Sequence, residues 1–69
     1  MAQFRIVYQD GSVAKNTKVQ VSFNGGGMKT GFTDSRGDVT ISGSSTYGKI
    51  FVRGREVHSG SLNIGEVKI

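Results

Sequence analysis

Apolar and polar residues alternate along most of the chain, and this two-residue period is typical of strands with one buried face. The clearest run is 18–23, in which Val19, Val21 and Phe23 alternate with polar residues. The pattern predicts short strands over 3–8, 18–23, 28–33, 38–42, 49–53 and 56–58, and one or two more over 62–69. The fold class it indicates is all-β: a small, mostly antiparallel β-sandwich of six to seven short strands, with a small β-barrel as the alternative.

The range 31–41 organises this prediction because it contains a strand, a tight turn and a second strand. Asp34 can accept a hydrogen bond from the backbone two residues on, and Gly37 can adopt the positive φ that such a turn often needs. Glycines in 24–27 predict a hairpin connection, and Gly54 predicts a break or a bulge after the strand over 49–53.

Length and composition restrict the architecture further. The chain has 69 residues, 11 glycines, no proline and no cysteine. This length predicts a single domain over 1–69, and the glycines disfavour long helices. The absence of cysteine excludes disulfides, thiolate metal sites and thiol nucleophiles. A metal staple usually needs more than the single histidine, His58, and we expect no metal and no cofactor.

The first residues of the chain bear on the cellular compartment of the protein, and its net charge bears on its partners. The first residues run straight into the strand over 3–8, without the basic start, apolar core and cleavage site of a signal peptide. No apolar run approaches the roughly 20 residues of a membrane helix. We therefore predict a cytoplasmic protein with no membrane insertion. Its net charge of +4 is ordinary for a small domain, and it also permits weak attraction to nucleic acid.

A series of short patterns follows in order along the chain: Asp10-Gly11, Val19-x-Val21-x-Phe23, Gly31-x-Thr33-Asp34-x-x-Gly37-x-Val39-x-Ile41 and Tyr47-Gly48-x-Ile50-x-Val52-x-Gly54. From Val19 to Gly54 this series resembles the carboxypeptidase regulatory-like and transthyretin-like β-sandwich domains. In two places it departs from their pattern: Asn16-Thr17-Lys18 replaces the usual small residue and alanine before the first valine strand, and Arg55 follows Gly54 where an aromatic is usual. The resemblance implies a β-sandwich with a stabilising or interaction role and no catalytic residues.

Basic residues flank an aromatic residue in the strand over 49–53 and just beyond it. In an extended strand Lys49, Phe51 and Arg53 share one face, and Arg55 follows. These four residues are the candidate interaction surface. Cations that track phosphates beside a ring that stacks on a base are typical of single-stranded nucleic-acid-binding proteins. A solvated sheet face with one partly covered aromatic is the simpler interpretation, because the paired aromatics of small cold-shock-like barrels are absent.

Other patterns that suggest chemistry each have a simpler structural interpretation. The range 25–30 lacks the glycine before lysine and the following helix of a phosphate-binding loop, which favours a flexible hairpin tip. The sequence around Asp34 and Asp38 lacks the further oxygen ligands that a Ca²⁺-binding loop needs. Hydrogen bonding within the turn is therefore the favoured interpretation of these carboxylates. The tripeptide at 36–38 spells an integrin-binding motif, but its glycine has a structural reason in the turn. No nucleophile elbow accompanies His58, and we predict that the protein is not an enzyme.

Two functions follow from these observations. The first is a non-catalytic protein-interaction or structural β-sandwich module that acts through a sheet face or an edge strand. Its partner is protein, either another chain or a second copy joined through edge strands, and the terminal run 66–69 is a candidate edge. Val7 and Phe51, opposite the apolar faces of their strands, are expected to be exposed or to cover a second surface. The alternative is a small basic single-stranded nucleic-acid-binding β protein, which requires the basic residues to cluster.

Overall fold

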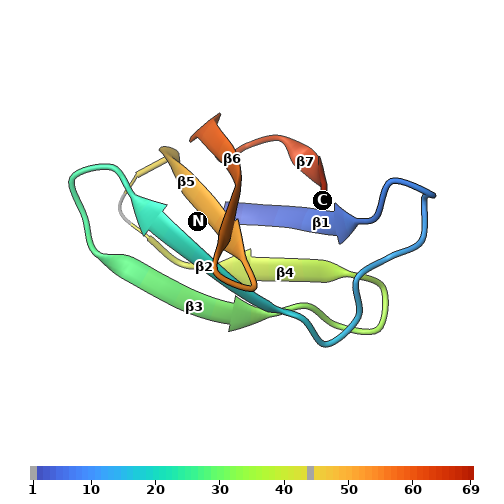
Figure 1. The fold of residues 1–69 in the computed structure, drawn as a ribbon. Helices are drawn as coiled ribbons and strands as arrows, with labels where there is room; N and C mark the ends of the chain where they lie inside the picture. Colours follow the sequence, from blue (N-terminus) through green and yellow to red (C-terminus); the bar gives the residue numbers. More distant parts are fainter. Residues whose placement is uncertain (1, 44) are drawn as a thin grey trace.

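The computed structural model describes residues 2–43 and 45–69. Seven strands account for most of them: β1 (Ala2–Val7), β2 (Lys18–Phe23), β3 (Met28–Phe32), β4 (Asp38–Ile41), β5 (Tyr47–Val52), β6 (Arg55–Ser61) and β7 (Gly65–Lys68). They form a three-stranded sheet in the order β4-β1-β7 and a four-stranded sheet in the order β3-β2-β5-β6 (Figure 1). The prediction of an all-β fold with six to seven strands in a sandwich is confirmed. The described residues form no helix with the length and apolarity that a membrane crossing requires.

All strand pairs but one are antiparallel. The exception joins β1 to β7, which run parallel with Ile6 opposite Val67. The β2–β3 hairpin forms over the predicted 24–27 connection, where the Phe23 N–H donates to the Gly27 carbonyl at 3.1 Å. As predicted, β7 lies at the edge of its sheet.

The core lies between the two sheets, and alternation along each strand determines which side chains enter it. On β1 the inward side chains include Phe4 and Ile6, and on β2 they include Val19 and Val21. The buried cluster consists of Ala2, Phe4, Ile6, Ala14, Val19, Val21, Phe23, Val39, Ile41, Ile50, Val52, Leu62 and Val67. The alternative that Val7 is exposed is wrong, because Val7 is only 4% exposed and forms a bridge with Val13 in the loop after β1.

The turn between β3 and β4 carries the chain from one sheet to the other. Its Asp34 carboxylate accepts the N–H groups of Arg36 at 2.8 Å and Asp38 at 3.0 Å, and Gly37 has a φ of 80°. These two hydrogen bonds hold the pKa of Asp34 below its ordinary value, and the one from the Asp38 N–H has the larger effect. The turn interpretation of Asp34 and Gly37 is therefore confirmed. Gly31 permits the close approach of β3 to β4, since a Cβ there would lie 3.0 Å from the Ile41 side chain.

The region after β5 differs from the prediction in its length. Instead of a short strand over 56–58, β6 extends over Arg55–Ser61 and pairs with β5 along its whole length, with an irregularity between Ile50 and Phe51. Gly54 interrupts the strand as expected. It does so in a tight turn with Arg53, and both residues have positive φ, 55° for Arg53 and 79° for Gly54.

Candidate interaction surface

The side of the four-stranded sheet that faces away from the core is called the outer face here. Cross-strand partners in an antiparallel sheet project to the same side, which identifies its members. Thr30, Gln20, Phe51 and Glu56 form one row across the four strands. The neighbouring rows add Phe32 with Lys18 on one side, and Met28, Ser22, Lys49 and Ser59 on the other.

Strand β3 is one of the two edges of this sheet, opposite β6, and carries two of its most exposed apolar side chains. Met28 is 54% exposed and Phe32 is 64% exposed. Thr30 lies between them on the same side. An edge strand with large apolar side chains and a free backbone is a template for pairing with another strand.

The backbone of β3 offers this edge a regular set of hydrogen-bonding groups. The Thr33 N–H donates to the Thr17 carbonyl at 3.0 Å, which sets the phase of the ladder with β2. Because hydrogen-bonded pairs alternate in an antiparallel ladder, Met28, Thr30 and Phe32 direct their N–H and C=O groups away from β2. No hydrogen bond from these groups to described residues outside the strand pairings is formed.

The four residues of the predicted surface lie in two separate regions of the fold: Lys49 and Phe51 in one, Arg53 and Arg55 in the other. Lys49 and Phe51 lie on the outer face as expected. Lys49 has its ammonium 3.9 Å from the Glu56 carboxylate, and Phe51 is half-buried between Gln20 and Glu56.

Arg53 and Arg55 lie at the end of the sandwich, around a cavity between the sheets. The positive φ of Arg53 ends the strand alternation, so the expectation that Arg53 shares a face with Lys49 and Phe51 is wrong. Its guanidinium donates from Nη2 to the Tyr8 hydroxyl at 3.1 Å. Arg55 pairs with Val52, whose side chain is buried.

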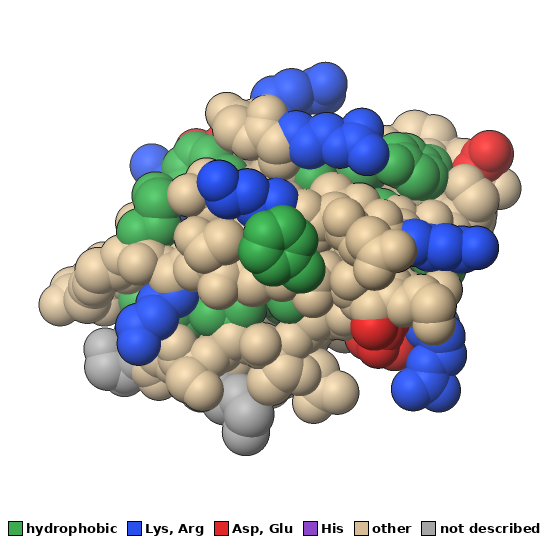
Figure 2. Space-filling view, turned by 90° about the horizontal axis from the view of Figure 1, so that it is seen from below, with side chains coloured by type: hydrophobic (Ala, Val, Ile, Leu, Met, Phe, Trp, Pro, Cys, Tyr) green, Lys and Arg blue, Asp and Glu red, His purple; other side chains and the backbone are tan. Residues whose placement is uncertain are grey.

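Basic side chains are distributed over the fold. Arg5 lies on the three-stranded sheet, and its Nε forms an ion pair with the Asp38 carboxylate at 2.9 Å. The hydrogen bond to Asp38 and the negative charge of Asp38 raise the pKa of Arg5. Lys68 lies on β7, Lys29 on β3 and Lys49 on β5. Figure 2 shows Lys and Arg side chains spread around one face, with hydrophobic side chains between them. Dispersal of this kind disfavours the clustered stripe that nucleic-acid binding requires.

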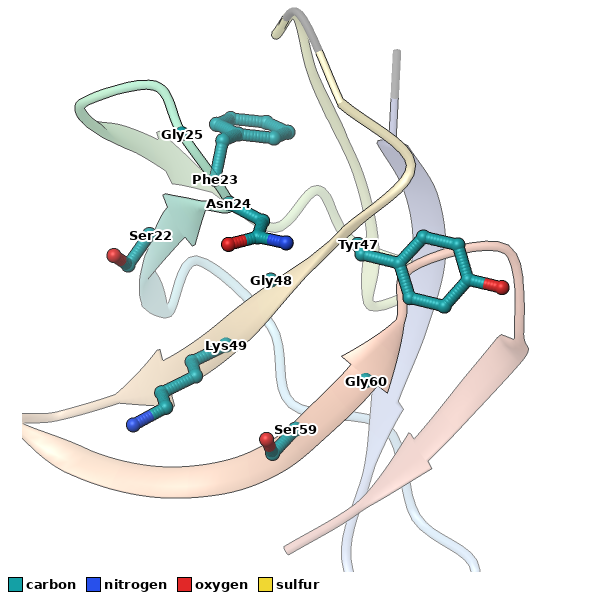
Figure 3. Close-up of a pocket in the computed structure, with 9 residues that line it drawn as sticks. All are labelled: Ser22, Phe23, Asn24, Gly25, Tyr47, Gly48, Lys49, Ser59 and Gly60. Atoms are coloured by element: carbon teal, nitrogen blue, oxygen red, sulfur yellow. The ribbon is translucent and has the colours of Figure 1, made fainter.

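A shallow polar groove of about 470 Å³ lies beside the β2–β3 hairpin. Gly48 and Gly60 are cross-strand partners in its lining, and the side chains of Asn24, Tyr47 and Lys49 border it (Figure 3). In Figure 3 the Tyr47 ring and the Lys49 side chain extend in different directions from β5. Among the described residues, no buried side-chain nitrogen or oxygen is left without a hydrogen-bond partner.

The remaining candidate residues have local partners. The Nε2 of His58 lies 2.7 Å from the Ser61 carbonyl oxygen and so donates to it, and in the described chain this ring has no hydrogen bond to a carboxylate or a serine hydroxyl. Within residues 2–43 and 45–69 no three His, Cys, Asp or Glu side chains gather as metal ligands would.

The edge character of β3 was not predicted from the sequence. The alternation of Met28, Thr30 and Phe32 was recognisable, but alternation is the same in edge and central strands. The available signal was Lys29, because a lysine on the core side of a strand is typical of an edge.

Comparison of the chain with protein-family models, with curated proteins and with solved structures found no match. The resemblance to carboxypeptidase regulatory-like and transthyretin-like domains therefore stays a prediction.

Proposed function

We propose that the protein is a non-catalytic interaction module that self-associates through β3. The observation that carries this proposal is the free edge of β3, where outward backbone groups coincide with the exposed side chains of Met28 and Phe32. The occupant we propose for this edge is the β3 strand of a second copy. The two four-stranded sheets would then join into one continuous sheet.

The sequence of β3 is self-complementary in an antiparallel arrangement. A two-fold axis at Thr30 places Thr30 opposite its own copy and Met28 opposite Phe32 of the copy. All three residues have outward backbone groups, so each pairing forms hydrogen bonds in the antiparallel ladder. The methionine sulfur also meets an aromatic ring, which is a favourable contact.

Lys29 limits the strength of this association. Lys29 alternates with Met28, Thr30 and Phe32 along β3. Its side chain therefore projects to the core side of the strand, beside Ser42 and Gly43. In the two-fold register Lys29 lies opposite Gly31 of the copy, which leaves room for the lysine side chain. The Lys29 ammonium nevertheless loses part of its hydration, and this loss weakens the dimer. Pairing of five-residue strands also buries little surface, so we expect a weak and reversible dimer.

Salt separates self-association from nucleic-acid binding. Each copy carries a net charge of +4, and two copies repel one another at low ionic strength. Added salt screens this repulsion and should strengthen the dimer, whereas it weakens contacts with phosphates. The nucleic-acid alternative is favoured by one observation, the position of Lys49 beside Phe51 on the outer face.

The experiment is sedimentation equilibrium over a wide range of protein concentration, with three variants. Thr30→Pro removes the central outward N–H without breaking a bond to β2, and should abolish the dimer; Thr30→Val keeps the donor and should dimerise normally. A buried aromatic covers roughly 200 Å², and Phe32 is 64% exposed. Half-burial of that exposed area gives about 1.5 kcal/mol in each copy and about 3 kcal/mol in the symmetric dimer, so Phe32→Ser in both copies should weaken the dimer by roughly 150-fold.

Three results would overturn the proposal: a monomer at every concentration and salt, a dimer that Thr30→Pro leaves intact, or a dimer that salt weakens. A parallel titration with labelled single-stranded DNA and RNA, using Lys49→Ala/Phe51→Ala as the control, tests the alternative at the outer face. Salt-sensitive binding that the double variant abolishes would support nucleic acid as the partner.

A further inference from the structure

A cavity of about 270 Å³ opens between the two sheets at the end of the sandwich that contains the β5–β6 turn. Val52 and Val57 line it from the four-stranded sheet. Tyr8, just after β1, and Ile69, just after β7, line it from the other side. Tyr8, Val57 and Ile69 pack against the core cluster, so the wall of this end cavity is continuous with the core.

Two arginines, Arg53 and Arg55, line this apolar wall, and neither has an acidic partner among the described residues. Arg53 donates one N–H to the Tyr8 hydroxyl, and the other N–H groups of its guanidinium are available. Arg55 is exposed. The ion pairs of the described residues are those of Arg5 with Asp38 and Lys49 with Glu56, so no described carboxylate lies within 4.0 Å of either guanidinium of the end cavity.

We propose that the end cavity binds a small carboxylate with an unbranched apolar tail. The tail lies against Val52, Val57 and Ile69, and the carboxylate is held by Arg53 and Arg55 at the opening. A guanidinium matches a carboxylate with two parallel N–H donors, and burial of methylene groups supplies the remaining affinity. An apolar wall with a few convergent polar groups is the usual form of a small-molecule site.

The inference is independent of self-association. The end cavity involves β5 and β6, and β3 lies at the opposite edge of the same sheet. Thr30→Pro, which is designed to remove the dimer, should leave carboxylate binding unchanged. Failure of one proposal is therefore distinguishable from failure of the other.

The test is a titration of the full chain with butanoate, hexanoate and octanoate, followed by backbone amide chemical shifts. We expect the shifts to concentrate at residues 8, 52–57 and 69. Each added methylene that is fully buried should tighten binding about fourfold, until the tail fills the cavity. Hexanol and hexylammonium are the matched probes for the charge, and inorganic phosphate is the matched probe for an anion without a tail.

Matched variants separate the roles of the arginines. Arg53→Gln and Arg55→Gln should each weaken hexanoate roughly tenfold and leave hexanol unchanged, because only the charge-assisted hydrogen bonds are lost. Lys49→Gln, on the outer face, should leave both affinities unchanged. Equal affinity for hexanoate and hexanol, equal affinity for phosphate, no dependence on tail length, or shifts outside the end cavity would each overturn the proposal.

Discussion

Thr33 is the buried polar residue whose removal should most affect stability. It is 3% exposed and follows β3 at the start of the turn to β4. Its hydroxyl accepts the Thr17 N–H at 2.8 Å and donates to the Ala14 carbonyl. Both partners belong to the long connection between β1 and β2, so this one side chain joins that connection to the end of β3.

The change Thr33→Val keeps the shape of the side chain and removes both hydrogen bonds. A buried backbone group left without a partner costs about 1–3 kcal/mol. Two such groups give a loss of about 2–4 kcal/mol in the free energy of unfolding, allowing for partial relaxation. A domain of 69 residues has a total stability of about 3–10 kcal/mol, so the loss is a large part of it.

Urea denaturation followed by circular dichroism measures this loss. With a slope of about 1 kcal/mol per molar urea for so small a domain, the midpoint should fall by about 2 M or more. Thr33→Ser keeps the hydroxyl and should lose about 1 kcal/mol for the missing methyl group. Thr40→Val, on an exposed face of β4, should be neutral. A Thr33→Val midpoint equal to that of the unchanged protein, at an unchanged slope, would refute the reasoning.

Three further predictions follow from the same structure. Gly48→Ala should destabilise by about 2 kcal/mol or more, because its Cβ would lie 2.2 Å from the Ser22 carbonyl oxygen; Gly27→Ala, with no atom within 4 Å, should change the urea midpoint little. Since the pKa of Asp34 is lowered by folding, its stabilisation is complete above the ordinary pKa of 3.8 and is lost as pH falls through the folded value. Asp34→Asn should therefore flatten the acid limb of a stability–pH profile, and an unchanged limb would contradict this assignment. Lys29→Val should strengthen self-association by removing a charge that loses part of its hydration in the proposed dimer, and an unchanged sedimentation profile would count against the proposed register.

Local patterns in the sequence predicted much of the fold. The strand 18–23 was predicted with the bounds that β2 has, because its alternation involves only neighbouring residues. The 24–27 hairpin and the Asp34 turn were predictable for the same reason, since side-chain oxygens and glycines act within a few residues. The parallel pairing of β1 with β7 was not predicted, because it joins Ile6 to Val67 across almost the whole chain.

The candidate surface shows where local patterns are insufficient. Extrapolation of the strand period past Val52 placed Arg53 beside Phe51, and one residue with positive φ was enough to move it to the end of the sandwich. A non-glycine residue rarely adopts this conformation, so nothing in the residue pattern indicated that the strand ends before Gly54.

Sheet order, more than strand period, determines which surface of this protein is available for interaction. Phe51 and Phe32 each alternate with residues of the opposite face and are indistinguishable by pattern. Phe51 is half-buried because β5 has neighbours on both sides, and Phe32 is exposed because β3 has one neighbour. Only long-range pairing creates this difference, and the same pairing leaves the backbone groups of Met28 and Phe32 at the open edge of β3, next to their exposed side chains. A search for partners should therefore begin at β3.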